Sequence, residues 1–441
     1  MGTYVPNSPA AQREMLDAVG VSTLEDLYAS VPHQMLLGDR LGLAAGLSEL
    51  EVRTAVTALA EKNKIFKTVL RGAGAERHFI PAAVGAVTSR EELVTAYTPY
   101  QAEISQGILQ SIFEYQTMIC ELTGMDVANA SVYDVGSAAG EAVAMCRDRK
   151  RVHAYISACV HPDVIGTVKT YCFGSDTQVT VLPAKDGKTD LDALRAALGD
   201  DAACFIAQQP NYFGQLEDAA AIGEIVHAAG AKYVLSVHPI ACALLPTPAE
   251  YGADIAVGEG QSLGLDTAFG GPYLGFMATT KKLMRQLPGR IVGETHDTEG
   301  NVGYVLTLTA REQHIRREKA SSNLCSNQAL CAFTAGVYLT AMGETGLRQA
   351  ASLSLSKAHY FADELAKIGF PRLYPGDFFH EFVTTCACCQ ADGCQGKALD
   401  ALAAQGILGG QPVENGILWC VTEVVTKAEL DKAISILKEV C

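Results

Sequence analysis

The chain has 441 residues, of which 49% are hydrophobic and 19% are charged, so it can bury the core of one large domain or of two to three ordinary ones. Its 34 Lys and Arg against 49 Asp and Glu give a formal net charge of −15. This charge excludes the basic surface that neutralises phosphates, so we expect neither nucleic acid nor an anionic membrane as a partner. The longest uncharged apolar stretch, 233–249, contains three prolines, which argues against a membrane span.

The N-terminus and the cysteines indicate a reducing compartment. The first residues lack a basic start, an apolar run and a small-residue cleavage site, so we expect a cytoplasmic protein with reduced thiols. Four of the 14 cysteines cluster in CACCQADGC, namely Cys386, Cys388, Cys389 and Cys394. Their spacing matches no zinc-finger or zinc-ribbon pattern, which favours structural or exposed thiols over a metal site. We predict no metal site in this chain.

Residues 1–70 are predicted to form a helical N-terminal segment. Ser22 with Glu25, and Ser48 with Glu51, match capping boxes. In such a box the Ser oxygen accepts a hydrogen bond from an amide at the start of the helix, and the Glu side chain reaches back.

The pattern over 71–345 predicts a large α/β domain. A long helix is indicated over 104–122, where apolar residues recur at steps of three and four, and Gly124 ends it. Between about 130 and 280, short continuous apolar runs alternate with helical patterns. The runs are HAYISACV, QVTVLP, CFIAQQP, KYVLSV, DIAV and YLGFMA. Such runs are typical of strands buried on both faces of a mostly parallel sheet.

Residues 346–441 are predicted to form a small α+β domain. A helix over about 324–342 leads into it, and helical patterns then alternate with the strand-like runs HEFVTTC and ILWCVTEV. The common nucleotide-binding motifs fail, because a phosphate loop would need a glycine where Leu182 stands, and the glycine pattern over 258–264 is one residue too long for a dinucleotide fingerprint. Spacing alone therefore indicates no specific activity.

Longer segments carry a family resemblance. They are YTPYQAEISQG (97–107), QQPNYFG (208–214), GEGQSLG with FGGPYLGF, PGRIVGET (288–295) and TAREQHIRREKASSNLCSNQAL (309–330). In combination they closely resemble the family of glycine dehydrogenase (decarboxylating), the P protein of the glycine cleavage system, and within it the alpha branch, subunit 1. The resemblance covers essentially the whole chain.

This resemblance implies a fold-type-I pyridoxal-phosphate (PLP) architecture and an enzyme made of two different chains. In that family the lysine that binds PLP lies on the companion beta subunit, subunit 2. Glycine loses its carboxylate as CO2, and its aminomethyl group passes to the lipoyl arm of the H protein, with PLP as the electron sink. The resemblance also implies a heterodimer or a dimer of heterodimers.

The residues agree with a chain that lacks its own covalent cofactor. No lysine occurs between 233 and 280, and the position expected for it falls near Gln261 or Ser262, neither of which can form a Schiff base. Ser236, Val237 and His238 stand where an Asp is expected to meet the pyridinium nitrogen. We therefore expect the partner to bind PLP covalently. The rival functions are a self-sufficient PLP enzyme, of aminotransferase or desulfurase type, and a non-catalytic scaffold.

In this architecture one side of each pocket comes from the neighbouring subunit. Ser321, Ser322 and Asn323 precede the helix predicted from about 324, where free amides and the helix dipole favour a phosphate. We interpret them as contacts to the phosphate of the PLP that the partner holds. The alternative is ordinary N-capping by Ser322, Asn323 or Ser326.

Tyr97, Tyr100, Gln101 and Glu103 flank a proline at the start of the long helix. The resemblance makes them candidates for lining the shared pocket or the channel of the lipoyl arm. The alternative is a turn and cap at a buried helix start.

His314 lies in a basic run with Arg311, Arg316 and Arg317 that could receive a carboxylate. The alternative is an ion pair between Glu312 and Arg316 on a solvated helix face.

Two histidines and a glycine-rich turn remain. His161 and His238 follow strands, near where a ring could stack on a cofactor, but without the lysine the sequence favours structural histidines with satisfied ring nitrogens. The turn GSAAG, 136–140, opens a helix and resembles a phosphate cradle. We interpret this turn as the remnant of a phosphate site that this chain no longer uses.

Overall fold

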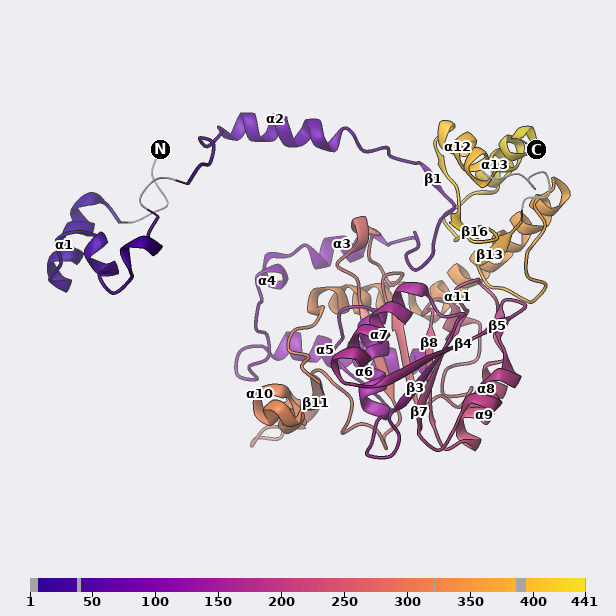
Figure 1. Ribbon diagram of the computed structural model, residues 1–441, viewed down its shortest axis with the longest axis horizontal. Coiled ribbons are helices and arrows are strands. Elements are labelled where there is room, and N and C mark those ends of the chain that lie inside the picture. Colours follow the sequence, from indigo (N-terminus) through magenta and orange to yellow (C-terminus); the bar gives the residue numbers. More distant parts are fainter. Residues whose placement is uncertain (1–6, 38–40, 321, 386–393, 441) are drawn as a thin grey trace. The chain divides into compact units, whose positions relative to one another are not determined.

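The computed structural model describes residues 7–37, 41–320, 322–385 and 394–440 (Figure 1). Contacts divide the chain into two units, Met1–Ile65 and Phe66–Cys441. Cys386, Cys388 and Cys389 lie outside the described residues, so the interpretation of the cysteine cluster stays a prediction. Within the described residues, no helix combines the length and the apolar character needed to cross a bilayer.

The first unit is helical, which agrees with the prediction for residues 1–70 except at Thr68–Val69, which form a strand of the second unit. Its elements are α1 (Pro9–Val19), η1 (Glu25–Tyr28), η2 (His33–Met35) and α2 (Glu49–Ala60). The capping box of Ser48 and Glu51 is confirmed at the start of α2. The box predicted for Ser22 and Glu25 is wrong. The turn there is instead closed by Asp26, whose carboxylate accepts from the amides of Ser22 and Thr23, at 2.9 and 2.8 Å.

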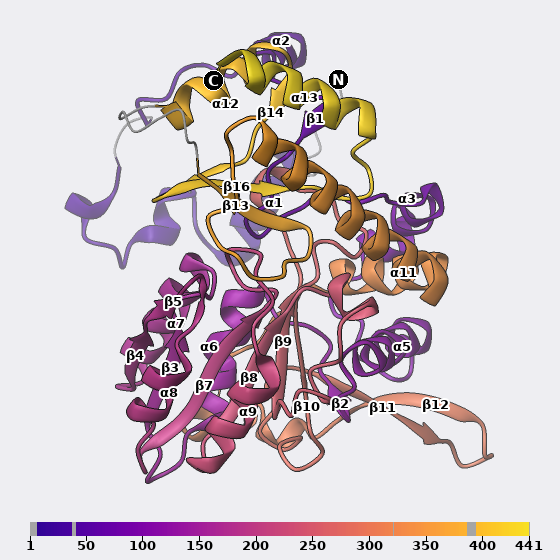
Figure 2. The same ribbon diagram turned by 90° about the vertical axis from the view of Figure 1, so that its right-hand side faces the viewer.

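The second unit is built on a seven-stranded sheet in the order β2-β10-β9-β8-β7-β3-β4 (Figure 2). Its strands are β2 (Val127–Ala128), β3 (His153–Ser157), β4 (Gln178–Leu182), β7 (Ala202–Gln209), β8 (Lys232–Val237), β9 (Ile255–Glu259) and β10 (Gly275–Thr279). The strands from β9 to β4 are parallel, and β10 is antiparallel to both of its neighbours. All six apolar runs predicted as strands are therefore confirmed, as is the mostly parallel sheet.

Helices cover both faces of this sheet, which explains the continuous apolar runs. Along β7, Phe205 and Ala207 pack in a core cluster with α5, α8 and α9, while Cys204 and Ile206 pack in a second cluster with α6 and α7. These helices are α5 (Gln106–Thr123), α6 (Val135–Cys146), α7 (Pro162–Gly174), α8 (Leu191–Ala197) and α9 (Ala219–Ala228). Gly124 ends α5 with φ 70°, as predicted.

Smaller elements border the sheet. The hairpin β11 (Ile291–His296) and β12 (Val302–Thr307) packs against α5, where the rings of Tyr304 and Phe113 lie 5.4 Å apart. No strand was predicted there. The other short elements are α3 (Ala82–Thr88), α4 (Glu91–Val94), β5 (Ala184–Lys185), β6 (Lys188–Thr189), η3 (Ala241–Ala243), η4 (Ala268–Gly270), η5 (Thr309–Arg311), α10 (Gln313–Arg316) and η6 (Arg317–Lys319).

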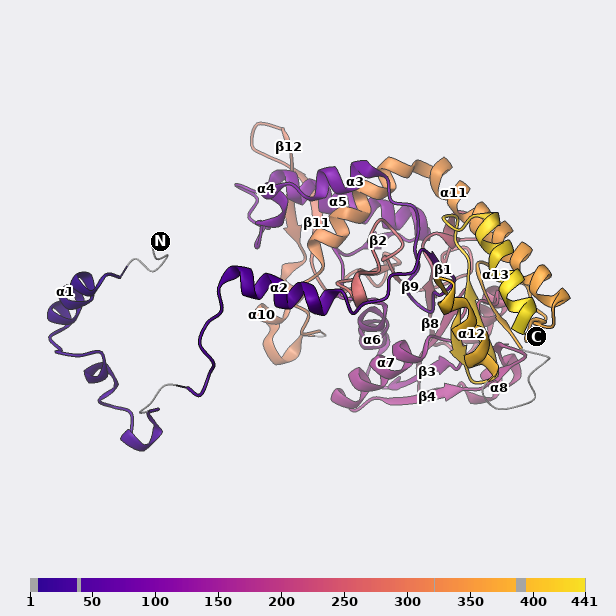
Figure 3. The ribbon, with the colours of Figure 1, turned by 90° about the horizontal axis from the view of Figure 1, so that it is seen from above.

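The long helix α11 (Ala329–Lys367) connects the sheet to the C-terminal part, passing from α5 to α13 (Figure 3). It begins five residues later than predicted and carries one non-helical residue, Gly343. The N-capping role considered for Ser322, Asn323 and Ser326 is therefore wrong, because the helix is preceded by Gln328, whose side chain makes no cap hydrogen bond.

The C-terminal part has its own sheet, in the order β13-β16-β15, and its own core. Its elements are β13 (Glu381–Thr384), α12 (Cys394–Ala404), β14 (Ile407–Leu408), β15 (Gln411–Val413), β16 (Gly416–Cys420) and α13 (Lys427–Val440). Trp419 is fully buried there, and its Nε1 donates to Thr384 Oγ1 at 2.8 Å. The strand β1 (Thr68–Val69) pairs with β14. The domain boundaries at 70 and 345 stay predictions.

Substitution of Phe382 by alanine tests the C-terminal core. Phe382 is fully buried on β13, so the shortened side chain leaves a cavity, and we expect Phe382→Ala to lower the free energy of unfolding by about 3–5 kcal/mol. Urea unfolding measures this loss. Phe173→Ala is the matched control, because Phe173 is 88% exposed and should change stability by less than about 0.5 kcal/mol. Equal losses in both variants would contradict the buried position of Phe382.

Candidate functional site

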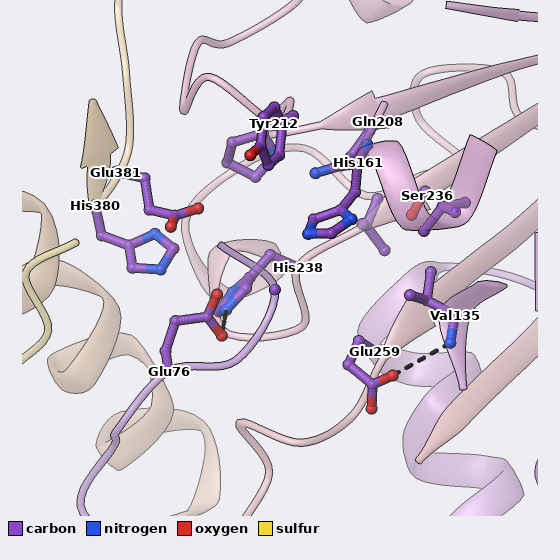
Figure 4. A pocket seen from close by; sticks show the side chains of 14 residues that line it. Glu76, Val135, His161, Gln208, Tyr212, Ser236, His238, Glu259, His380 and Glu381 are labelled. Atoms are coloured by element: carbon purple, nitrogen blue, oxygen red, sulfur yellow. Dashed lines mark hydrogen bonds and ion pairs between the residues drawn. The ribbon is translucent and has the colours of Figure 1, made fainter. Parts of the chain in front are cut away.

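A cavity lies at the carboxyl ends of the parallel strands, the place where open α/β sheets bind ligands (Figure 4). Strands β7, β8 and β9 end at it, and α6 and α7 begin beside it. The C-terminal part and the segment that follows β1 close the other side. The lining residues are Gly74, Glu76, Val135, His161, Val164, Gln208, Pro210, Tyr212, Ser236, Val237, His238, Glu259, His380 and Glu381.

Gln261 occupies the position expected for a Schiff-base lysine, and its amide is already engaged. It is 1% exposed. Its Oε1 accepts from the amide of Glu76 at 2.9 Å, and its Nε2 donates to the carbonyls of Glu76 and Leu265, at 3.0 and 2.7 Å. No lysine occurs among the described residues that line the cavity. Gln261 therefore fixes the segment around residue 76 instead of offering an amine.

The amino end of α6, where a cofactor phosphate would bind, holds two carboxylates of the chain itself. Asp134 Oδ1 accepts from the amide of Ser137 at 2.7 Å, and Glu259 Oε2 accepts from the amide of Val135 at 3.2 Å. The other oxygen of Glu259 accepts from Leu274 at 2.8 Å. Since these acceptors already use amides at this helix end, they compete with a phosphate for its hydrogen-bond donors.

Burial controls the charge of Glu259. Its removal from water raises its pKa to about 7, against the lowering effect of the amide hydrogen bonds from Leu274 and Val135. Ser236, which stands where the pyridinium nitrogen would need an acid, is a buried hydroxyl. With no lysine, no acid at the position of the pyridinium nitrogen and a helix end already occupied by two carboxyl groups, the cavity of this chain does not fit PLP.

A group of histidines fills one side of the cavity. The rings of His238 and His380 lie 4.8 Å apart, and the ring of His78 lies 5.9 Å from that of His238. Glu76 Oε2 is 3.5 Å from Nε2 of His238. Burial lowers the pKa of His380 well below its usual 6.5, and the charges of His238 and His78 lower it further while Glu76 opposes them. His380 is therefore a neutral imidazole at pH 7.

Sequence reasoning singled out only His238 from this group. It missed Glu76, His78 and His380 because the four residues come from three segments far apart in the chain, and no short spacing pattern joins them. His161 agrees with the structural interpretation, since its Nδ1 accepts from Asp163 at 3.1 Å and its Nε2 contacts the carbonyl of Ala73 at 2.8 Å. The same interpretation stays a prediction for His238, whose Nδ1 accepts a long hydrogen bond from Ala241 at 3.4 Å and whose Nε2 only faces Glu76 Oε2 at 3.5 Å.

The predicted residues before α5 lie outside this cavity. Tyr97 is 93% exposed, and Gln101 and Glu103 are also exposed. Tyr100 is half-buried, its hydroxyl donates to Asn327 Oδ1 at 3.2 Å, and the guanidinium of Arg290 lies 4.0 Å from the centre of its ring. The four residues therefore stay candidates for a surface shared with a partner.

His314 is connected to Tyr100 through two charged residues. Glu312 Oε2 lies 3.8 Å from Arg290 and 3.6 Å from His314 Nδ1. The ion pair considered between Glu312 and Arg316 is therefore wrong, because Glu312 faces Arg290 and His314 instead. The guanidinium group of Arg311 is not free to bind a carboxylate, since it donates to the carbonyls of Leu287 and Gly289.

The predicted phosphate contacts lie in a different hollow. Ser322 and Asn323 border it together with Glu141 and Arg317, and Ser321 lies outside the described residues. Ser322 Oγ donates to Glu141 Oε1 at 2.9 Å and accepts from the amide of Leu324 at 3.0 Å. Ser322 and Asn323 thus line a different hollow from the strand-end cavity.

Comparisons with known proteins identify the relatives of this chain. Residues 2–437 match the family model described as glycine cleavage system P-protein. The chain is 48% identical to "Probable glycine dehydrogenase (decarboxylating) subunit 1" of Carboxydothermus hydrogenoformans, over 98% of this chain and 99% of the relative. It is 47% identical to the protein of the same name from Moorella thermoacetica, over 99% of both chains.

Solved structures give the same result for the fold. The crystal structure of the glycine decarboxylase (P-protein) of the glycine cleavage system in inhibitor-bound form is similar with a TM-score of 0.91 and 40% identity, over 100% of both chains. A sphingosine-1-phosphate lyase of Burkholderia pseudomallei is similar with a TM-score of 0.66 and 14% identity, over 94% of both chains, and shares the fold alone. The predicted fold-type-I architecture is confirmed.

The raised pKa of Glu259 predicts a pH effect on stability. A folded pKa of about 7 against an ordinary 4.5 means that this group stabilises the fold fully below pH 4.5 and that the contribution is lost as the pH rises through 7. We expect the fall in the free energy of unfolding between about pH 5 and pH 8 to be smaller in Glu259→Gln than in the unmodified chain.

Urea unfolding at a series of pH values measures this difference. Glu250→Gln is the matched control, because the amide of Thr247 lowers the pKa of Glu250, and that shift acts only below pH 4.5. An unchanged pH slope in Glu259→Gln would contradict the proposed ionisation.

Proposed function

Because this chain belongs to the glycine cleavage system P-protein family, we propose that it is subunit 1 of a two-chain glycine dehydrogenase (decarboxylating). Together with subunit 2 it decarboxylates glycine, releases CO2 and transfers the aminomethyl group to the lipoyl arm of the H protein. PLP is bound covalently by subunit 2 and not by this chain. A cytoplasmic location is part of the same proposal.

One observation supports the proposal that subunit 2, and not this chain, binds PLP covalently. At the cavity where a PLP enzyme of this fold would hold its cofactor, Gln261 stands in the place of the lysine and uses its amide to hold the backbone of Glu76. A carboxamide cannot form a Schiff base. Glu259 and Asp134 also occupy the helix end that would bind the phosphate. The chain therefore needs a partner to supply the covalent site.

Exposed apolar side chains support a large interface with that partner. None of the described side chains of α1 or α2 is buried, and Leu50 of α2 is 76% exposed. Tyr97 and Ile104, in one of the segments that carry the family resemblance, are 93% and 79% exposed. Interfaces of permanent heteromers bury about 2,000 Å² or more and are rich in such side chains. A heterodimer or a dimer of heterodimers satisfies this need.

The residues near this exposed segment are proposed to complete the site of subunit 2. Tyr97, Tyr100, Gln101 and Glu103 form a surface around the start of α5, and His314 is linked to it through Glu312 and Arg290. We assign these residues to the pocket for glycine or to the path of the lipoyl arm. Ser321, Ser322 and Asn323 are assigned to the phosphate of the PLP that the partner holds.

Reconstitution tests the proposed function. We expect glycine–CO2 exchange with lipoylated H protein only when this chain and subunit 2 are combined, because neither contains a complete site. Borohydride reduction of the assembled enzyme should modify a lysine of subunit 2 and none of this chain. Full activity of subunit 2 alone would favour a scaffold role, and a PLP adduct on this chain would favour a self-sufficient enzyme.

Substitution of the proposed phosphate contacts tests the shared pocket. The triple variant Ser321→Ala, Ser322→Ala and Asn323→Ala should weaken retention of PLP by the assembled enzyme about 10- to 100-fold, since hydrogen bonds to a charged group contribute about 1.5–3 kcal/mol. Absorbance of PLP after gel filtration measures its retention. Ser326→Ala is the matched control, an exposed serine of the same segment. Equal retention in both variants would remove these residues from the site.

A further inference from the structure

Three imidazoles and one carboxylate meet on one side of the strand-end cavity. One nitrogen or oxygen atom from each of Glu76, His78, His238 and His380 lies within 4.8 Å of the corresponding atoms of the other three. Figure 4 shows Glu76, His238 and His380 together, away from Ser236 and Val135. A tetrahedral zinc ion with bonds of 2.0–2.1 Å holds its ligand atoms about 3.3 Å apart, so shifts of about 1 Å would complete the geometry.

The imidazoles of His78 and His380 are buried and that of His238 is mostly buried, and all three have too few hydrogen-bond partners. His380 is 2% exposed, and neither of its ring nitrogens has a hydrogen-bond partner among the described residues. Nε2 of His78 and Nε2 of His238 also have no hydrogen-bond partner. The nearest acceptor to Nε2 of His238, Glu76 Oε2, forms an ion pair with it at 3.5 Å, which is long for an N–H···O bond. Buried polar atoms are nearly always paired. A cation bound by one nitrogen of each ring would satisfy three of these four atoms.

The surroundings orient two of the four groups. Nδ1 of His78 lies 2.8 Å from Glu423 Oε2, which leaves Nε2 as the nitrogen available to a cation. Glu423 is itself held by the amide of Phe79, at 2.6 Å. Gln261 holds the backbone of Glu76 on both sides. Carboxylates behind a ligating histidine are the usual outer partners of a metal site, because they fix the ring and its tautomer.

One contact opposes metal binding through Nε2 of His238. The amide of Ala241 approaches Nδ1 of this ring at 3.4 Å. Ligation through Nε2 would place the proton on Nδ1 and break this long, weak hydrogen bond.

We propose that Glu76, His78, His238 and His380 bind one zinc-class divalent cation. Imidazole nitrogens and a carboxylate suit zinc and its neighbours, whereas magnesium and calcium need oxygen ligands. Four protein ligands leave no open position, so the site is structural and not catalytic. The cation would tie the segment after β1, the end of β8 and the start of β13 to one another. This proposal departs from the prediction of no metal site made from the sequence.

Zinc titration of the purified full chain, freed of metal by a chelator, tests the proposal. We expect one zinc ion per chain, an increase in melting temperature with zinc, and a cobalt(II) derivative with the visible absorption of four-coordinate nitrogen and oxygen ligation. His380→Asn and His238→Asn should each weaken binding at least about 100-fold, and Glu423→Gln about 10- to 100-fold. Absence of stoichiometric zinc binding would overturn the proposal.

Two controls separate this cluster from other ligands. His161→Asn removes a histidine of the same cavity whose two nitrogens are already engaged, so it should leave zinc binding unchanged. A chain with Cys386, Cys388, Cys389 and Cys394 all changed to serine should also keep its zinc. Zinc that survives in His380→Asn but is lost with these cysteines would overturn the proposal.

The cobalt spectrum of the unmodified chain decides the case if the histidine variants fail to fold. An absorption band from thiolate-to-cobalt charge transfer would overturn the proposal, and its absence together with four-coordinate bands would support it. These readouts do not depend on glycine decarboxylation, so the metal site and the proposed function can fail separately.

Discussion

Parallel pairing of β9, β8, β7 and β3 brings the carboxyl ends of four strands to one edge of the sheet, and the rest of the site depends on this constraint. The strands are buried on both faces, so their residues are committed to the core and the side chains that follow each strand are the first that can do chemistry. Ser236 and Glu259, in the last two residues of their strands, and His238, directly after β8, line the cavity. The chemistry of the chain is decided by which side chains stand at these few positions.

In this chain those positions are used to hold the protein together. Gln261 links β9 to the segment around Glu76, and Glu259 caps the amino end of α6. The backbone amides at this end of the sheet thereby donate to side chains of the chain itself. The family to which the chain belongs and the absence of a lysine at the cavity agree with a subunit that contributes to a neighbour's site while retaining the fold of a PLP enzyme.

Local patterns in the sequence predicted the elements well where burial or a cap decides them. The apolar runs became strands because both faces of the sheet are covered, and Gly124 ended α5 because it adopts a left-handed conformation. Predictions failed where a neighbouring residue competed, as Asp26 did with Glu25. The cluster of Glu76, His78, His238 and His380 could not be predicted, because only tertiary packing joins its segments.

The two-residue strand β1 has a consequence for any shortened form of this protein. Thr68 and Val69 add a parallel strand beside Ile407 and Leu408, and Arg71 reaches the carbonyls of Gly409 and Gly410. The C-terminal part therefore takes one edge of its structure from a segment more than 300 residues earlier in the chain. Deletion of the helical N-terminus must stop before residue 68, because removal of β1 would leave an unpaired strand edge, the kind of surface on which chains aggregate.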